Sequence, residues 1–516
     1  MTLSGLHSAR LNEDGAWIAP DGDYQQLTRD LCGADPRLRQ QDEKMSRYGV
    51  YWSSRPCRVL ALEFQEKDLD GRAYPVVSHE FTDAESLGLF LNQRSCQDEQ
   101  AVRGARPTAH HNRVYIVEGA NRSFIGVLGP HFGIPPSLIM DYERITTVAV
   151  APDRGQSSLL YSNWGTRGYF VLSYQELFSL PLAARDKARA RCPDTARIIR
   201  GTRQNGKYAE TGMIHRRCGF WSDIRATQNG WDSIIFCDPP LRKIIILDDG
   251  PMKGHEVLAL PHPPGDGYID FFPPEIQLAC RAGPPRTSIA DDMCFYLTKY
   301  HEFVGVRDPD SASLFLKKII ASHYTKHFDF LRKNIMENLR GMGRQSHFAY
   351  SDLSSIEASW SDTQTLERRL GHFFLDLEEI LVQLRIPLET PDPRKVTSWQ
   401  DTEADFQFLY YRYKWIRESV DRVNSSITGL TSIAGNRQAL RSAERSTHIT
   451  FIGLLFIPLA FIASLFSMAD PYGPGKDKFW LYFATGIPVT ILVMMVYYIF
   501  DILLNWYEAA IKPAER

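Results

Sequence analysis

The chain contains Leu455-Phe-Ile-Pro-Leu-Ala-Phe-Ile-Ala-Ser-Leu-Phe-Ser-Met468 inside an uncharged apolar run that extends from His448 to Ala469. A second run extends from Phe479 to Ile499, and only residues 470–478 separate the two. Each run has roughly the 20 residues that an α-helix needs to cross the hydrocarbon of a bilayer. Because so short a connection joins neighbouring antiparallel helices, the sequence predicts an integral membrane protein with two spans and both chain ends on one side.

Basic residues near the two runs indicate which side that is, because they set the orientation while long domains count for little. They are Arg437, Arg441 and Arg445 before the first run, Lys512 and Arg516 after the second, and Lys476 and Lys478 between them. This distribution favours cytosolic termini, with the protein in the plasma membrane or an internal membrane. Residues 1–10 also lack the apolar stretch of a secretory signal.

Composition agrees with a cytosolic body. The formal net charge of −2 gives no reason to expect nucleic acid as a partner. All 8 cysteines precede the apolar runs and none lies in a C-x-x-C pair, as expected of reduced, buried thiols.

Several short β-branched or aromatic segments, among them 59–64, 114–117, 146–150, 169–172, 234–236 and 244–247, predict strands, and helical segments lie between some of them. The polar stretch from Asn92 to Asn112 is expected to be partly disordered. The predicted organisation is a partly disordered N-terminal region at 1–50, a cytosolic α/β domain at 51–300, a helical hairpin at 308–398, a long stalk helix at 399–447, transmembrane helices at 448–469 and 479–500, an extracellular or lumenal loop at 470–478, and a cytosolic tail at 501–516.

The long helix follows from a scarcity of proline, since Pro458 is the only one between Asp401 and Met468. We therefore expect one helix that passes from the cytosol into the membrane. Its first half carries an apolar seam with alternating steps of three and four residues, which is typical of a coiled coil. The seam comprises Phe406, Leu409, Tyr413, Ile416, Val420, Val423, Ile427, Leu430 and Ala434.

A second stripe lies roughly 200° around the same helix and consists of small or short polar residues except for Ile457. It begins at Ser425, and its members in and near the first apolar run are Ser446, Thr450, Gly453, Ile457, Ala460, Ser464 and Ser467. Such a stripe is expected of a helix that lines a narrow axial passage in a symmetric ring. The alternative is close helix packing through small residues.

The segment Leu455–Met468 resembles the first span of the CorA family of divalent-cation channels, with its Pro-Leu-Thr-Phe-Ile pattern leading to Gly-Met-Asn. The aromatic residues 479–483 resemble the start of that family's second span. Weaker similarities to a divergent eukaryotic branch with an enlarged cytosolic domain lie at 114–118, 132–135, 220–221, 230–231, 238–240 and 314–323. The resemblance implies a funnel-shaped homopentamer with an α/β domain, a long helix that forms the pore wall and a second helix outside it.

The same resemblance places the family's Gly-Met-Asn on Ser467-Met468-Ala469, so only the methionine is retained. The family's asparagine amide can hydrogen-bond the water shell of Mg²⁺, which dehydrates reluctantly, whereas Ala469 cannot. Together with Asp470, these residues are the predicted entrance.

Two functions remain open. One is a channel for a divalent cation, with Mg²⁺ as the expected ion and Asp470 supplying a ring of carboxylates. The other is a non-conducting membrane-anchored scaffold or sensor. The expected partners are further copies of the chain, the bilayer and divalent cations, with no tightly bound cofactor.

The sequence lacks the common catalytic motifs, including the P-loop, G-x-G-x-x-G, H-E-x-x-H and G-x-S-x-G, so an enzyme is not expected. His323 and His327 stand four apart on a predicted helix, where they form either a metal-binding pair or an ordinary helix surface. Acidic residues at 291–292, 376 and 378–379 either hold regulatory Mg²⁺ between subunits, as the resemblance implies, or form solvated faces.

Overall fold

The computed structural model describes residues 10–11, 17–18, 56–65, 76–103, 111–143, 168–185, 190–195, 197–204, 207–223, 230–250, 253–260, 271, 288–305, 308–347, 353–392, 394, 396, 398–467 and 475–511. The chain divides into two compact units, Met1–Asn424 and Ser425–Arg516. The predicted strand at 146–150 and nearly all of the predicted N-terminal region 1–50 lie outside the described residues.

The first unit is built on a 10-stranded sheet with the order β12-β11-β7-β8-β9-β10-β5-β3-β4, in which β6 pairs with β9. Its strands are β3 (Arg58–Gln65), β4 (Val77–Phe81), β5 (His111–Glu118), β6 (Tyr169–Ser179), β7 (Ala190–Arg191), β8 (Ile198–Gln204), β9 (Lys207–Ser222), β10 (Asp232–Cys237), β11 (Lys243–Gly250) and β12 (Lys253–Leu258). The short strands β1 (Arg10–Leu11) and β2 (Trp17–Ile18) pair separately. Pairing is antiparallel except between β10 and β5.

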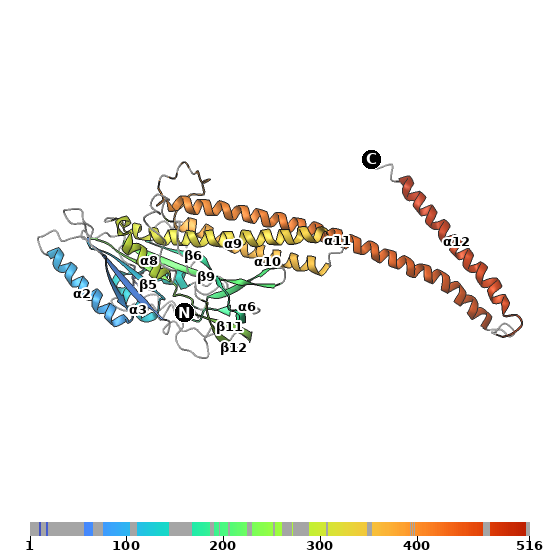
Figure 1. Ribbon diagram of the computed structural model, residues 1–516, viewed down its shortest axis with the longest axis horizontal. Helices are drawn as coiled ribbons and strands as arrows, with labels where there is room; N and C mark the ends of the chain where they lie inside the picture. The colour runs from blue at the N-terminus through green and yellow to red at the C-terminus, as the bar shows by residue number, and fades with distance from the viewer. Residues whose placement is uncertain are drawn as a thin grey trace. The chain divides into compact units, whose positions relative to one another are not determined.

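Among the described residues, four helices lie between strands in the sequence, and the others follow the last strand (Figure 1). The helices are α2 (Ala84–Arg103), α3 (Arg122–Phe132), α4 (Pro136–Glu143), α6 (Leu182–Arg185), α8 (Ile289–Lys299), α9 (Leu314–His347), α10 (Leu353–Gln383), α11 (Thr402–Ser467) and α12 (Trp480–Ile511), and 3₁₀ turns occupy His301–Phe303 and Pro309–Ser313. The predicted arrangement of an α/β region followed by a helical region is therefore confirmed.

The two faces of the sheet contribute to different hydrophobic cores. One face packs with α8, α9, α10 and the first part of α11, through residues such as Leu172, Ile235 and Phe315. The other face packs with α2, α3 and α4, through residues such as Leu87 and Trp221. The seam residues from Phe406 to Ile427 are buried, which confirms the predicted seam over that range.

Strand β6 pairs only with β9 among the described strands, so one of its edges needs other hydrogen-bond partners. Helices supply them. The backbone N–H of Val171 donates to Gln383 Oε1 of α10 at 2.5 Å, and the Tyr324 hydroxyl of α9 donates to the Ser173 carbonyl at 2.9 Å. The helical region is thus attached to the sheet through the open edge of β6.

The hydrogen bonds continue from this edge to α11. The Tyr413 hydroxyl donates to the Tyr324 carbonyl at 3.2 Å, and His327 Nδ1 lies 2.8 Å from the same hydroxyl. Because the hydroxyl has one hydrogen, which it donates to the carbonyl, Nδ1 of His327 is the donor in the second bond. A chain of buried hydrogen bonds therefore connects β6, α9 and α11.

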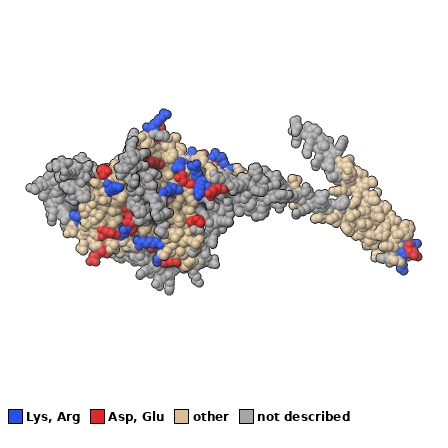
Figure 2. Space-filling model, in the orientation of Figure 1, with Lys and Arg blue, Asp and Glu red and all other residues tan. Residues whose placement is uncertain are grey.

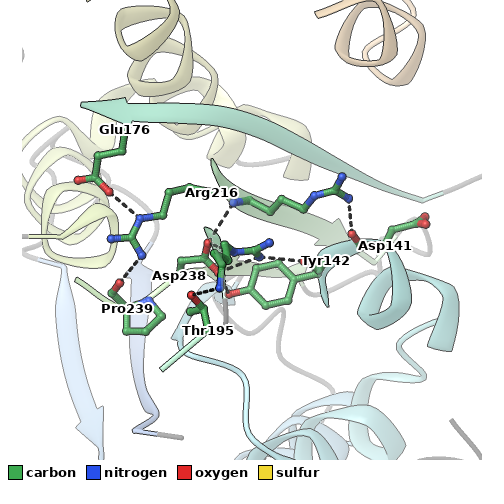
Figure 3. A network of polar contacts seen from close by, with 9 residues as sticks. Asp141, Tyr142, Glu176, Thr195, Arg216, Asp238 and Pro239 are labelled. Carbon is green, nitrogen blue, oxygen red and sulfur yellow. Dashed lines mark hydrogen bonds and ion pairs between the residues drawn. The ribbon is translucent and has the colours of Figure 1, made fainter. Parts of the chain in front are cut away.

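A second buried network joins β9, β10 and α4 around Asp238 (Figure 3). Arg197 Nε lies 2.5 Å from Asp238 Oδ2, the Tyr142 hydroxyl donates to Oδ1 at 3.1 Å, and the Arg217 backbone N–H donates to Oδ2 at 3.1 Å. Burial opposes ionisation of Asp238, but Arg197 and then Arg216 outweigh it and hold the pKa of this carboxyl below its ordinary value. The carboxylate is therefore charged and well satisfied.

Arg216 extends this network toward β6. Its Nε donates to Glu176 Oε2 at 2.6 Å, and its Nη1 donates to the Pro239 carbonyl at 2.7 Å (Figure 3). The guanidinium of the next residue, Arg217, donates instead to the Asp141 carbonyl at 2.6 Å.

One sequence-based expectation is wrong in part. The stretch from Asn92 to Asn112 is expected to be partly disordered, but α2 continues through its first half to Arg103 and β5 begins at His111. The physical reason is that Leu87 and Leu91 anchor the first turns of α2 in a core, and the polar residues extend the helix beyond it.

We expect Tyr324→Phe to lower the free energy of unfolding by about 1–3 kcal/mol, because it leaves the buried Ser173 carbonyl without a partner. Tyr411→Phe is the matched control, since the Tyr411 hydroxyl makes only an exposed contact with Thr390. Chemical unfolding of the purified protein in detergent measures both. Equal losses in the two variants would contradict the role assigned to the β6 edge.

Asp238→Asn should lower the free energy of unfolding by about 3–5 kcal/mol, because it keeps the side-chain size but leaves Arg197 buried without a countercharge. Glu256→Gln, in an exposed pair with Lys243, should have little effect. The pKa of Asp238 is lower in the folded state, so its contribution is present above the unfolded pKa and is lost as the pH falls through the folded one. The wild type should therefore lose stability below about pH 4 more steeply than Asp238→Asn. Parallel acid unfolding profiles would count against this assignment.

Candidate functional site

The second unit contains the continuation of α11 and all of α12. Among the described residues, Trp480–Ile499 is long and apolar enough to cross a membrane by length and composition, and Ile452–Leu465 of α11 is a shorter apolar stretch. Figure 2 shows that the described surface of these helices carries almost no charge except at the loop that joins them. The structure thus contains one candidate span by this criterion, and the two-span arrangement remains a prediction.

Helices α11 and α12 pack through small residues. A Cβ atom added to Gly486 would lie 3.4 Å from Leu459 Cδ2, so the glycine allows close approach. The Tyr482 hydroxyl donates to the Leu459 carbonyl at 3.4 Å, and the hydroxyl of buried Thr490 donates to the Gly486 carbonyl at 2.8 Å. Ile462 on α11 is also buried.

The small-residue stripe lies on a different side of α11. At 100° per residue, its members from Ser446 to Ser467 are rotated between roughly 80° and 180° from Leu459, which faces α12. Ser446, Thr450, Ile457, Ala460, Ser464 and Ser467 are exposed in the single chain, and Gly453 is half-buried. The stripe is therefore not the surface by which α11 contacts α12.

The predicted entrance is described only at its first residue. Ser467 is the last residue of α11, and Met468, Ala469 and Asp470 lie outside the described residues. At the other end of the loop Lys476, Asp477 and Lys478 are all exposed.

The histidine pair on α9 is buried, so the interpretation as an ordinary helix surface is wrong. His323 is 2% exposed and its ring lies 4.5 Å from that of Tyr174, while His327 is 0% exposed. Burial lowers the pKa of His327 to about 3, although Asp376 nearby favours the charged form. The two histidines pack in the core between the sheet and the helices, where aromatic rings contact both of them.

The candidate acidic residues are also largely engaged. Asp291 lies 2.6 Å from the Arg58 guanidinium, and Asp376 lies 3.4 Å from His215 Nε2. Glu379 accepts a hydrogen bond from Gln383 at 3.2 Å, and Asp292 is 1% exposed. Over the described residues, no group of three or more His, Cys, Asp or Glu side chains could hold a metal ion.

Sequence reasoning missed the α12 side of the hairpin. Gly486 and Thr490 stand four residues apart in the second apolar run, and this small-xxx-small spacing is a usable signal of close helix packing. It predicts the face of α12 that contacts α11.

Several solved structures are similar to this chain, among them the following two. One is the complete structure of the CorA magnesium transporter from Methanocaldococcus jannaschii, with 11% identity, a TM-score of 0.36, and coverage of 84% of this chain and 96% of that one. The other is the structure of the full-length CmaX protein, with 12% identity, a TM-score of 0.34, and coverage of 78% and 91%. No curated protein matches the sequence significantly.

The family comparison is more direct. Residues 307–501 match the sequence model of the family described as CorA-like Mg2+ transporter protein. The matched range contains α9, α10, α11 and most of α12, including the hairpin with the small-residue stripe. In this region, which is less than half of the chain, the sequence is similar to the CorA-like Mg²⁺ transporter family.

Proposed function

We propose that this protein transports a divalent cation, with Mg²⁺ as the expected ion, along the axis of a homopentamer that is lined by α11. The family match at residues 307–501 supports the ion and the reaction class. The position of the small-residue stripe on α11, away from the face that packs on α12, is the observation that carries the pathway. In this proposal α11 and α12 both cross the membrane and both termini are cytosolic.

The stripe favours a pathway because of its polarity. Thr450, Ser464 and Ser467 are exposed in the single chain, and hydroxyl groups gain nothing from contact with lipid. The Thr450 hydroxyl donates to the Ser446 carbonyl at 2.9 Å, which leaves its oxygen lone pairs available to water. In a ring, such a face would meet its symmetry mates around an aqueous axis.

The entrance would select by charge. Asp470 precedes Pro471, and a proline disfavours helical backbone at the residue before it. A ring of such carboxylates at the mouth would attract a hydrated divalent ion. Ala469 offers only backbone groups, so it does not contribute the hydrogen bonds of an amide.

The alternative function is a non-conducting scaffold or sensor, and Ala469 is the observation that favours it. Purified protein in liposomes distinguishes the two. Mg²⁺ entry that rises with an inside-negative membrane potential supports transport, whereas protein-containing liposomes as tight as empty ones support the alternative.

The matched pair Ser464→Cys and Leu465→Cys tests the stripe. The two positions are neighbours on α11 and both are exposed in the single chain, but they lie about 100° apart around the helix. If the stripe lines a water-filled axis, a small charged thiol reagent should label Ser464→Cys at least tenfold faster and should block Mg²⁺ flux only in that variant. Equal labelling of the two positions would exclude a pore on this face.

Asp470→Asn tests the charge at the entrance. This substitution should reduce divalent flux or relax the preference for divalent over monovalent ions. Ala469→Asn should have the opposite effect and strengthen selection of Mg²⁺, because it restores an amide that can bond the water shell. Liposome flux with competing Na⁺ measures both. Unchanged flux and selectivity in Asp470→Asn would remove the carboxylate ring from the proposal.

A further inference from the structure

Two buried cysteines occupy opposite positions on neighbouring strands in the middle of the sheet. Cys218 on β9 is directly opposite Cys237 on β10 in the register of this antiparallel pair. Both are 0% exposed and both belong to the core that packs against the helices, so their side chains lie on the same face. Both are free thiols.

The hydrogen-bond pattern decides whether such a pair can be linked. In an antiparallel ladder, opposite residues alternate between hydrogen-bonded pairs and non-hydrogen-bonded pairs, whose Cα atoms lie only about 4.5 Å apart. The Asp223 N–H donates to the Asp232 carbonyl at 3.0 Å, so that pair is hydrogen-bonded. Counting along the register from there, the cysteines occupy a non-hydrogen-bonded pair.

Two further hydrogen bonds also indicate that the cysteines form a non-hydrogen-bonded pair. The Ser222 N–H donates to Gly168 at 3.3 Å, so alternate residues of β9 from Ser222 back to Cys218 direct their backbone groups toward β6. The Cys237 carbonyl accepts from the Gly119 N–H at 2.9 Å, beyond the end of β5 and away from β9. The backbone thus brings the two Cα atoms within the window of about 4.4–6.8 Å that a disulfide requires.

We propose that Cys218 and Cys237 are a redox modification site that forms an intramolecular disulfide with a low-molecular-weight disulfide as oxidant. In the reaction, one cysteine thiolate attacks a sulfur of oxidised glutathione and releases one glutathione thiolate. The second cysteine attacks the resulting mixed disulfide, which forms the Cys218–Cys237 bond and releases the second glutathione. Two cysteine thiols are oxidised, one glutathione disulfide is reduced, and the two cysteine protons pass to the released thiolates.

The surroundings keep the pair reduced at rest. Burial raises the pKa of both thiols, so little of the reactive thiolate is present and reaction requires a local opening of the sheet. Oxidation would then respond to sustained oxidising conditions rather than to brief exposure.

The position of the pair gives the modification a structural consequence. Cys237 precedes Asp238 and Cys218 follows Arg217, and these two neighbours bond each other through the Arg217 backbone N–H. A disulfide would fix β9 to β10 next to the buried charge network, and would restrict the unfolded chain across residues 219–236.

The test equilibrates the full-length protein in detergent with glutathione buffers of increasing oxidised fraction, until the result no longer changes with time. Free thiols are then alkylated under denaturing conditions and the digested protein is examined by mass spectrometry. We expect a peptide linked through Cys218 and Cys237 to accumulate as the oxidised fraction rises. We also expect the melting temperature to rise with it and to return after reduction.

Cys192→Ala is the matched control, because Cys192 is equally buried but belongs to another core. This variant should still form the link and show the shift in melting temperature, whereas Cys218→Ala and Cys237→Ala should do neither. The proposal is overturned if both cysteines are alkylated at the most oxidising ratio, or if either one is found linked mainly to a different cysteine. The wild-type measurement alone decides the matter if a variant fails to fold.

Discussion

The open edge of β6 is the constraint on which the arrangement of the first unit depends. A strand that pairs on one side only exposes alternate N–H and C=O groups, and leaving them buried without partners costs free energy. Val171 and Ser173 are two residues apart, so their backbone groups point to the same edge, where Gln383 and Tyr324 bond them. This requirement fixes the register of α9 and α10 against the sheet more narrowly than apolar packing does, since apolar contacts lack direction.

The same bonds give the long helix a defined position on α9. Tyr413 lies on the buried seam of α11 and bonds both the Tyr324 carbonyl and His327, so a shift of α11 by one turn would leave the Tyr413 hydroxyl and His327 Nδ1 without these partners. The ion pair between Lys318 and Asp405, at 2.5 Å, adds a second directional contact between the two helices. A movement of α11 relative to the sheet would have to break or exchange these bonds. Through these bonds the first unit restrains the helix whose continuation carries the proposed pathway.

Sequence reasoning reached the features that depend on periodicity. The seam from Phe406 to Ile427, the unbroken α11 and the α/β character of the first unit follow from spacing and from the scarcity of proline. It could not reach features that depend on which distant residues meet. The pairing of β6 with β9, the burial of His323 and His327, and the ion pair of Arg197 with Asp238 join residues far apart in the chain. Single-residue properties favour exposure for such polar side chains, and only their partners make burial acceptable.

The stripe on α11 also limits what kind of selection the proposed pathway can perform. Mg²⁺ holds its water strongly, and replacing that shell requires carboxylates or a rigid set of oxygen ligands. Apart from Ile457, the stripe from Ser446 to Ser467 offers hydroxyls, which can bond water, together with glycine and alanine, and it has no carboxylate. An ion on this axis would therefore keep its water shell, and the side chains would set the width available to that shell. Discrimination between ions of equal hydrated size would then depend on charge at the mouth, which places the greatest functional weight on the residues directly after Ser467.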